Sequence, residues 1–140
     1  MKTVAVAGYF DPLHEGHYHH LMRAKEYGEF LIVIVGTDYG IFLKRGTPSL
    51  ISQKARMSML LALPWVDGVV KNIDLDGTCA RTLELIRPNV FVKGGDRTLE
   101  NMPRNELRAC KKIGCEIVYG VGETLNSSTK IIKNLNGGRI

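Results

Sequence analysis

All four histidines of this 140-residue chain lie between residues 14 and 20. His14 and His17 are three residues apart, so they share a face if they lie on the first turn of a helix. Gly16 between them leaves room for a ligand to approach the backbone. The free N–H groups and partial positive charge of a helix amino terminus suit a phosphate group. Two imidazoles there can donate hydrogen bonds to phosphoryl oxygens and to charge that develops in a transition state.

Two other roles for these histidines stay open. His14, His17 and His20 could form a metal site, although the sequence contains no second cluster of ligands to complete it, and we predict no metal ligands. His14 and His17 could also be purely structural. We expect His19 and His20 to be exposed residues of the helix.

Two later segments could also contact phosphate. The first is Lys93-Gly94-Gly95-Asp96, in which the glycines let a ligand touch the backbone, the lysine offers a cation and the aspartate can accept hydrogen bonds. The second is Asn126-Ser127-Ser128-Thr129, at the start of the last expected helix. Its hydroxyl groups could bind phosphate, or they could simply cap the helix.

Short apolar runs alternate with helical patterns along the whole chain. Strands are expected at residues 4–7, 30–35, 66–70, 90–93 and 116–119, and helices at 17–27, 52–63, 78–87, 104–113 and 127–135. Residues 36–49 are expected to form a loop that could hold a short helical turn. This alternation predicts an α/β fold, with residues 1–140 forming one doubly wound, Rossmann-like domain: a five-stranded parallel sheet with helices on both faces. Ligands of such sheets bind beyond the carboxyl ends of the strands, where the three segments above are expected to meet.

The composition is that of a soluble globular domain, with 44% hydrophobic and 24% charged residues. The longest strongly apolar run, Phe30 to Val35, is far shorter than the roughly 20 residues of a membrane span, so we expect a cytoplasmic protein. The net charge of +5 suits nucleotides, sugar phosphates or nucleic acid. The chain has no arginine-rich tail, so we predict no nucleic-acid partner. Three cysteines without a CxxC pair predict buried free thiols.

Gly8 to His17 follows the pattern GxFDxxHxGH, and the chain resembles the cytidylyltransferase-like nucleotidylyltransferase family over nearly its whole length. Within that family it is most similar to the adenylyltransferase part of ADP-heptose synthase, through residues 65–70, 85–96 and 127–132. Glycerol-3-phosphate cytidylyltransferase shares the HxGH segment, but Gly122 and Glu123 stand where its arginine is expected. That enzyme, a FAD synthetase-like enzyme and a nucleotide-binding regulatory domain without turnover remain alternatives.

The resemblance implies that a phosphate oxygen of the acceptor attacks the α-phosphorus of ATP or CTP and that pyrophosphate leaves. The implied acceptor is a phosphorylated small molecule, such as the sugar phosphate heptose 1-phosphate. Mg²⁺ would accompany the triphosphate, and a homodimer is left open. The resemblance assigns catalysis to His14, His17 and Lys44, although Lys44 and Arg45 could instead be a solvated pair. It assigns nucleotide binding to Gly8, Tyr9, Phe10, Asp11, Gly16, Arg56, Lys93, Gly94, Gly95, Asp96, Ser127, Ser128 and Thr129.

Overall fold

The computed structural model describes residues 1–122, which form a five-stranded, all-parallel sheet in the order β3-β2-β1-β4-β5. The strands are β1 (Thr3–Gly8), β2 (Phe30–Val35), β3 (Gly68–Lys71), β4 (Val90–Val92) and β5 (Glu116–Val118). The helices are α1 (Glu15–Lys25), α2 (Asp38–Arg45), α3 (Gln53–Leu61), α4 (Ala80–Ile86) and α5 (Arg104–Ile113). The predicted fold class is therefore confirmed.

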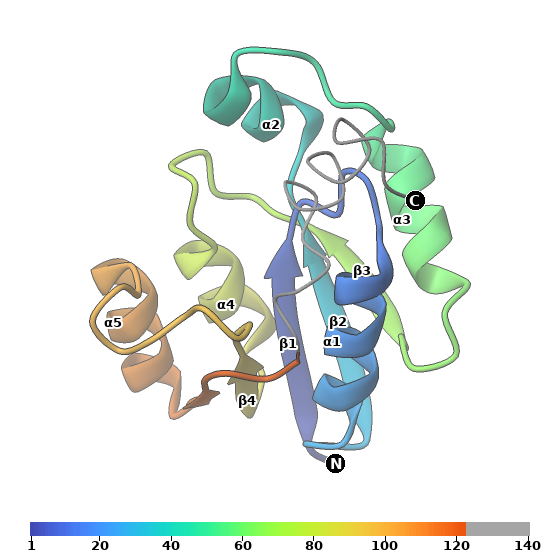
Figure 1. Ribbon diagram of the computed structural model, residues 1–140. Coiled ribbons are helices and arrows are strands. Elements are labelled where there is room, and N and C mark those ends of the chain that lie inside the picture. Colours follow the sequence, from blue (N-terminus) through green and yellow to red (C-terminus); the bar gives the residue numbers. More distant parts are fainter. Residues whose placement is uncertain (123–140) are drawn as a thin grey trace.

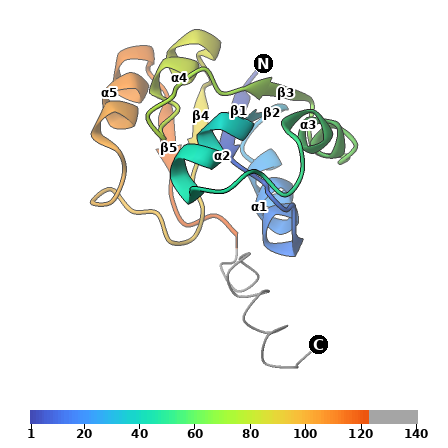
Figure 2. The ribbon, with the colours of Figure 1, turned by 90° about the horizontal axis from the view of Figure 1, so that it is seen from above.

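Alternate side chains of the central strand β1 enter two separate cores. Val4 and Val6 belong to the core on one face, and Ala5 belongs to the core on the other. Helices α1 and α3 pack on the first face, while α4 and α5 pack against each other on the second (Figure 1, Figure 2). Because both faces are covered, β1 and β2 are continuous apolar runs rather than alternating ones.

The direction of winding changes at β1. This strand pairs with β2 along six residues, from Thr3 opposite Phe30 to Gly8 opposite Val35, and with β4 on its other side. The chain leaves β1 toward α1 on one face and leaves β4 toward α5 on the other, so the segments that follow the two strands diverge. A crevice opens at such a point, beyond the carboxyl ends of the strands.

Residues 36–49 differ from the expected loop because eight of them form α2. Thr37 caps this helix by accepting a hydrogen bond from Gly40 N at 2.9 Å, and Gly46 ends it with a φ of 77°, which favours glycine. Helix α3 begins as predicted, with Ser52 as its N-cap. The helix expected at 127–135 lies outside the described residues.

Two further observations concern the cysteines and the lengths of the helices. All three cysteines are buried and free, as predicted. Within residues 1–122, no helix is both long enough and apolar enough to cross a membrane.

Candidate active site

Three connected pockets follow the carboxyl-terminal edge of the sheet. The first, here called the histidine pocket, has a volume of about 250 Å³. It is lined by Ala7, Gly8, Phe10, His14, Gly16, His17, His20, Gly94, Gly95, Asp96 and Val121. The structure thus brings together the ends of β1 and β4 and the start of α1, as the sequence predicted.

The other two pockets continue from the first. The lysine pocket, of about 170 Å³, shares Ala7 and Gly8 with the histidine pocket. It is further lined by Tyr9, Ile34, Gly36, Lys44, Asn72, Gly77, Thr78, Cys79, Lys93, Arg97, Pro103 and Glu106. The outer pocket, of about 450 Å³, adds Thr37, Gly40, Leu43, Asp74, Leu75 and Asp76. The lysine pocket shares lining residues with both of the other pockets, so the three form one continuous cleft.

His14 and His17 together cap the first turn of α1. His14 has extended backbone, with φ −142° and ψ 178°, and its Nδ1 accepts a hydrogen bond from Gly16 N at 3.0 Å. In turn, Nδ1 of His17 accepts a hydrogen bond from His14 N at 3.3 Å. The two rings stack with their centroids 3.7 Å apart, and the edge of Phe10 supports His17 at 4.8 Å. The two side chains therefore have fixed orientations.

These hydrogen bonds also assign the protons of the two rings. A backbone N–H can only donate, so Nδ1 of both His14 and His17 is unprotonated and each neutral ring has its proton on Nε2. Burial, and then the nearby His14 and His20, lower the pKa of His17 to about 3. Burial also lowers the pKa of His14. At neutral pH, both side chains therefore offer an Nε2–H donor and no charge.

His20 is not the exposed residue that the sequence predicted. It lines the histidine pocket, and its Nδ1 donates a hydrogen bond to the Val121 carbonyl oxygen at 2.7 Å. Burial lowers the pKa of His20 despite this hydrogen bond, which raises it, and the charge of Lys93 lowers it further. His20 thus ties α1 to the chain after β5. His19 is the more exposed of the pair, and it contacts Glu15 at 3.4 Å.

Glycines at the strand ends allow aromatic rings to pack against the backbone. A Cβ on Gly8 would lie 3.0 Å from the Phe10 ring, and a Cβ on Gly36 would lie 2.2 Å from the Tyr9 ring. Phe10 itself has a φ of 55°, a strained conformation for a non-glycine residue. The packing of these two rings shapes the floor of the cleft between β1 and β2.

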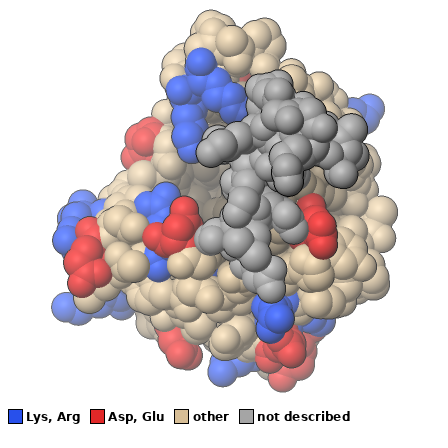
Figure 3. Space-filling model, viewed as in Figure 1, with Lys and Arg blue, Asp and Glu red and all other residues tan. Residues whose placement is uncertain are grey.

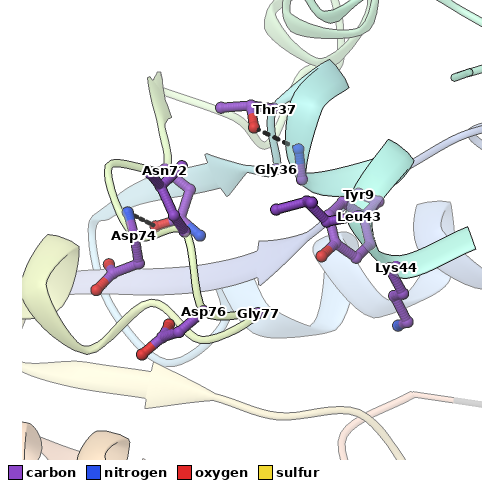
Figure 4. Close-up of a pocket in the computed structure, with 11 residues that line it drawn as sticks. Tyr9, Gly36, Thr37, Leu43, Lys44, Asn72, Asp74, Asp76 and Gly77 are labelled. Carbon is purple, nitrogen blue, oxygen red and sulfur yellow. Dashed lines mark hydrogen bonds between the residues drawn. The ribbon is translucent and has the colours of Figure 1, made fainter. Parts of the chain in front are cut away.

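Lys44 lies on the last turn of α2 rather than on a glycine-rich loop, and it lines the lysine and outer pockets. Its Nζ lies 5.1 Å from the centroid of the Tyr9 ring. Tyr9, Leu43 and Lys44 form one wall of the outer pocket, facing the segment of Asn72 to Gly77 that follows β3 (Figure 4). Lys44 is therefore placed beside the histidine pocket but not in it.

Arg56 does not face the cleft, in contrast to what the resemblance implied. It is 1% exposed and lines none of the three pockets. Its guanidinium donates to the carbonyl oxygens of Tyr9, Gly36 and Ile51 at 2.7–2.9 Å and pairs with Asp38 at 2.8 Å. Arg56 therefore joins the ends of β1 and β2 to α2 and α3, and it positions the site from behind.

Asp11 has a similar structural role instead of contacting the cleft. Its buried carboxylate accepts hydrogen bonds from Leu50 N and Ile51 N, each at 2.8 Å, and pairs with Arg45 at 2.8 Å. These bonds hold the segment between α2 and α3 against the loop after β1. Arg45 is thus engaged with Asp11, which leaves Lys44 as the cation that α2 offers to the cleft.

The charges of the lysine pocket favour an anion. Lys44, Lys93 and Arg97 line it, and Glu106 is its only carboxylate among the described residues. On the wider surface, Figure 3 shows Lys and Arg side chains gathered beside α2, whereas over α5 they alternate with Asp and Glu side chains. The pocket is therefore suited to a phosphate group.

The sequence analysis missed several residues that line the cleft, and it grouped Lys93 with three residues that line a different pocket. Lys93 points into the lysine pocket, whereas Gly94, Gly95 and Asp96 line the histidine pocket. Asn72, Asp74, Arg97 and Glu106 were not singled out. Ser127, Ser128 and Thr129 lie outside the described residues, so their phosphate-binding role stays a prediction.

Comparison with known proteins identifies the family of the chain. The chain matches the family model described as cytidylyltransferase-like over residues 5–134. The bifunctional protein HldE of Geotalea uraniireducens is 35% identical over 140 residues, which are 99% of this chain and 28% of that protein. HldE of Pseudomonas aeruginosa is 39% identical over 133 residues, 94% of this chain and 27% of that protein. The chain thus spans little more than a quarter of the length of these relatives.

A solved structure extends the comparison. The lipopolysaccharide core biosynthesis protein from Thermoplasma volcanium superposes with a TM-score of 0.71 at 26% identity, covering 88% of this chain and 98% of that one. The fold and these matches place the chain in the nucleotidyltransferase class of domains. The chain belongs to the cytidylyltransferase-like family.

Proposed function

We propose that this enzyme transfers a nucleoside monophosphate from ATP or CTP to a sugar 1-phosphate, such as heptose 1-phosphate, and releases pyrophosphate. The observation that supports this most strongly is the juxtaposition of two pockets. One offers two neutral Nε2–H donors at a helix amino terminus, and the next offers three cations. The similarity to HldE and to a lipopolysaccharide core biosynthesis protein supports a sugar phosphate as the acceptor.

The triphosphate is proposed to bind in the histidine pocket. Its phosphoryl oxygens would accept hydrogen bonds from the Nε2–H groups of His14 and His17 and lie near the positive end of α1. Charge on these oxygens rearranges as the α-phosphorus is attacked, so donors that are already oriented stabilise the transition state. Neutral donors suit this task because their protons stay in place across neutral pH.

The acceptor is proposed to bind in the lysine pocket, which meets the histidine pocket at Gly8. Lys44 would attract its phosphate group and hold one oxygen in line with the α-phosphorus. That oxygen forms the new bond, the bond to the β-phosphate breaks and pyrophosphate carries away the electron pair. No protein nucleophile is needed, so catalysis rests on positioning and on charge stabilisation.

Mg²⁺ is proposed to arrive with the triphosphate. Within residues 1–122, no group of three or more His, Cys, Asp or Glu side chains could hold a metal ion. In that part of the chain, Asp96 is the one carboxylate that lines the histidine pocket. The phosphates and water would then supply most of the ligands of the ion, as is usual for Mg²⁺ at triphosphate sites, and the bound ion would neutralise phosphate charge.

The test is to incubate the enzyme with Mg²⁺, each of the four ribonucleoside triphosphates in turn and a panel of phosphorylated acceptors, and to follow pyrophosphate release. Heptose 1-phosphate, hexose 1-phosphates and glycerol 3-phosphate form the panel. We expect release that requires both a triphosphate and a sugar 1-phosphate. Release only with glycerol 3-phosphate would favour the alcohol-phosphate alternative, and no release with any acceptor would contradict the proposed function.

A further inference from the structure

The carboxylate of Glu106, on α5, is buried against the lysine pocket, and one of its oxygens lacks a hydrogen bond within the described residues. The residue is 4% exposed. Its Oε2 accepts hydrogen bonds from Cys79 N at 3.0 Å and from Cys79 Sγ at 3.6 Å. Its Oε1 is buried and has no hydrogen-bond partner among the residues that the structure describes. Lys93 Nζ lies 3.8 Å from Oε1, which is close enough for an ion pair but too far for a hydrogen bond.

An unpaired buried carboxylate oxygen costs stability unless a ligand completes it. Leaving a buried acceptor without a hydrogen bond lowers stability, and more so for a charged group. Glu106 also occupies the buried stripe of α5, with Ala109 and Cys110 three and four residues further on. The hydrogen bond from Cys79 N accounts for Oε2, and an apolar side chain at this position would leave that N–H without its acceptor. Oε1 has no such structural partner among the described residues, and it is this oxygen that points to a role in binding.

The chemistry of the pair defines the group that would complete it. Oε1 needs a hydrogen-bond donor, while the ammonium of Lys93 needs an acceptor. A hydroxyl group satisfies both, because its hydrogen can point to Oε1 while its oxygen accepts from Nζ. The Lys93 side chain is only 12% exposed, and its Nζ lies 4.5 Å from the centroid of the Phe91 ring, so its position is constrained. A phosphate group does not fit beside Oε1, because both are anionic.

The pocket has room for more than a water molecule. Its volume of about 170 Å³ is several times the roughly 30 Å³ that one water occupies. Glu106 lines this pocket together with Tyr9 and Lys44, the residues on its side toward the outer pocket. A ligand with a phosphate at one end and hydroxyl groups at the other would match both ends.

We propose that Glu106 and Lys93 are the specificity-determining pair of the acceptor subsite, with Oε1 of Glu106 accepting a hydrogen bond from a ring hydroxyl group of a sugar phosphate. The pair selects polyhydroxylated phosphates over simple phosphomonoesters and directs the phosphate away from Glu106. This inference rests on the proposed function, which it deepens by assigning the residues that recognise the acceptor.

The test is a calorimetric titration of wild-type and Glu106→Gln enzyme with two probes, heptose 1-phosphate and methyl phosphate. Methyl phosphate has the phosphate group but no hydroxyl group. The α,β-methylene analogues of ATP and of CTP are added in turn, so that the site is filled and no transfer occurs. In the Glu106→Gln variant, the amide oxygen accepts from Cys79 N and the NH₂ group faces the pocket, so the charged acceptor is lost. We expect heptose 1-phosphate to bind about 10–100-fold more weakly, the scale of one hydrogen bond to a charged group, and methyl phosphate to bind as before.

Asp67→Asn is the matched control. Like Glu106, Asp67 accepts a hydrogen bond from a backbone N–H, that of Leu31, and pairs with a lysine, Lys25. It precedes β3, at the opposite edge of the sheet from the cleft. We expect this variant to bind both probes as the wild type does. A melting temperature for each variant shows whether the fold is kept, and Glu106→Asp, which withdraws the carboxylate by one methylene, replaces Glu106→Gln if the latter does not fold.

Equal weakening of both probes, or unchanged binding of heptose 1-phosphate, would overturn the inference. So would a wild-type enzyme that binds the two probes equally or binds neither. Failure of the proposed function is a separate result, because it is the absence of pyrophosphate release, whereas these titrations measure binding without transfer.

Discussion

Replacement of His17 separates the two tasks that the structure gives this residue. Its Nδ1 accepts the backbone hydrogen bond from His14, and its Nε2–H is free to donate in the histidine pocket. Asparagine has its Oδ1 attached at the same carbon as Nδ1 of histidine, so His17→Asn keeps the helix cap but no longer presents a donor where Nε2 stood. His17→Ala removes both.

The size of each effect follows from these contacts. Losing one oriented donor to a developing oxyanion lowers kcat by about 10²–10³. Losing a helix cap costs about 1 kcal/mol of the free energy of unfolding, which is a few degrees in the melting temperature for a domain of this size. We therefore expect both variants to show the same fall in kcat, and only His17→Ala to show the lower melting temperature.

The assay is steady-state pyrophosphate release at saturating triphosphate, together with thermal denaturation monitored by circular dichroism. His19→Ala is the control, because His19 is on the same helix but contacts Glu15 at its surface. If His17→Asn keeps kcat within about threefold of the wild-type value, or if His19→Ala lowers it as much, the assignment of the Nε2 donor is wrong.

Three further predictions follow from contacts around the cleft. Lys44→Met should change the free energy of unfolding by less than about 0.5 kcal/mol, because the Lys44 ammonium is exposed beside Tyr9. The same variant should strongly lower kcat at saturating triphosphate, and unchanged turnover would make Lys44 a surface charge only. Arg56→Met should lower the free energy of unfolding, measured by urea denaturation, by about 3–5 kcal/mol, because it leaves three backbone carbonyl groups and Asp38 without their donor. A decrease of less than about 1 kcal/mol would refute the positioning role of Arg56. Burial lowers the pKa of His17 to about 3, so below about pH 6.5 the unfolded chain binds a proton that the folded chain does not. The free energy of unfolding should then fall by up to about 1.4 kcal/mol for each pH unit between 6.5 and 3, and His17→Asn should flatten this dependence.

Helices and strands with a strong local pattern of apolar residues could be predicted from the sequence, whereas α2, which lacks such a pattern, could not. The apolar runs of β1 and β2 have that pattern because strands buried on both faces are continuously hydrophobic. Helix α2 has few buried residues and contains Gly40, so no apolar stripe marks it. Its two boundary signals, Thr37 as N-cap and Gly46 at the end, are visible in the sequence but are weak by themselves.

Residues that depend on distant partners could not be assigned a position. His20 is half-buried, and its Nδ1 bonds to the carbonyl oxygen of Val121, 101 residues further along the chain. Arg56 is buried because the ends of two strands present carbonyl groups to it. Glu106 is different, because its spacing from Ala109 and Cys110 places a carboxylate in the buried stripe of α5, and that misfit is a signal the sequence does contain.

The central claim, nucleotidyl transfer to a phosphorylated acceptor, is tested most directly by isotope labelling. The enzyme is incubated with Mg²⁺, heptose 1-phosphate and a triphosphate that is labelled with ³²P at the α position in one reaction and at the γ position in another. We expect the α label to appear in the sugar product and the γ label only in pyrophosphate. Transfer of the γ label to the sugar phosphate, or no labelled product with either triphosphate, would contradict the proposed reaction.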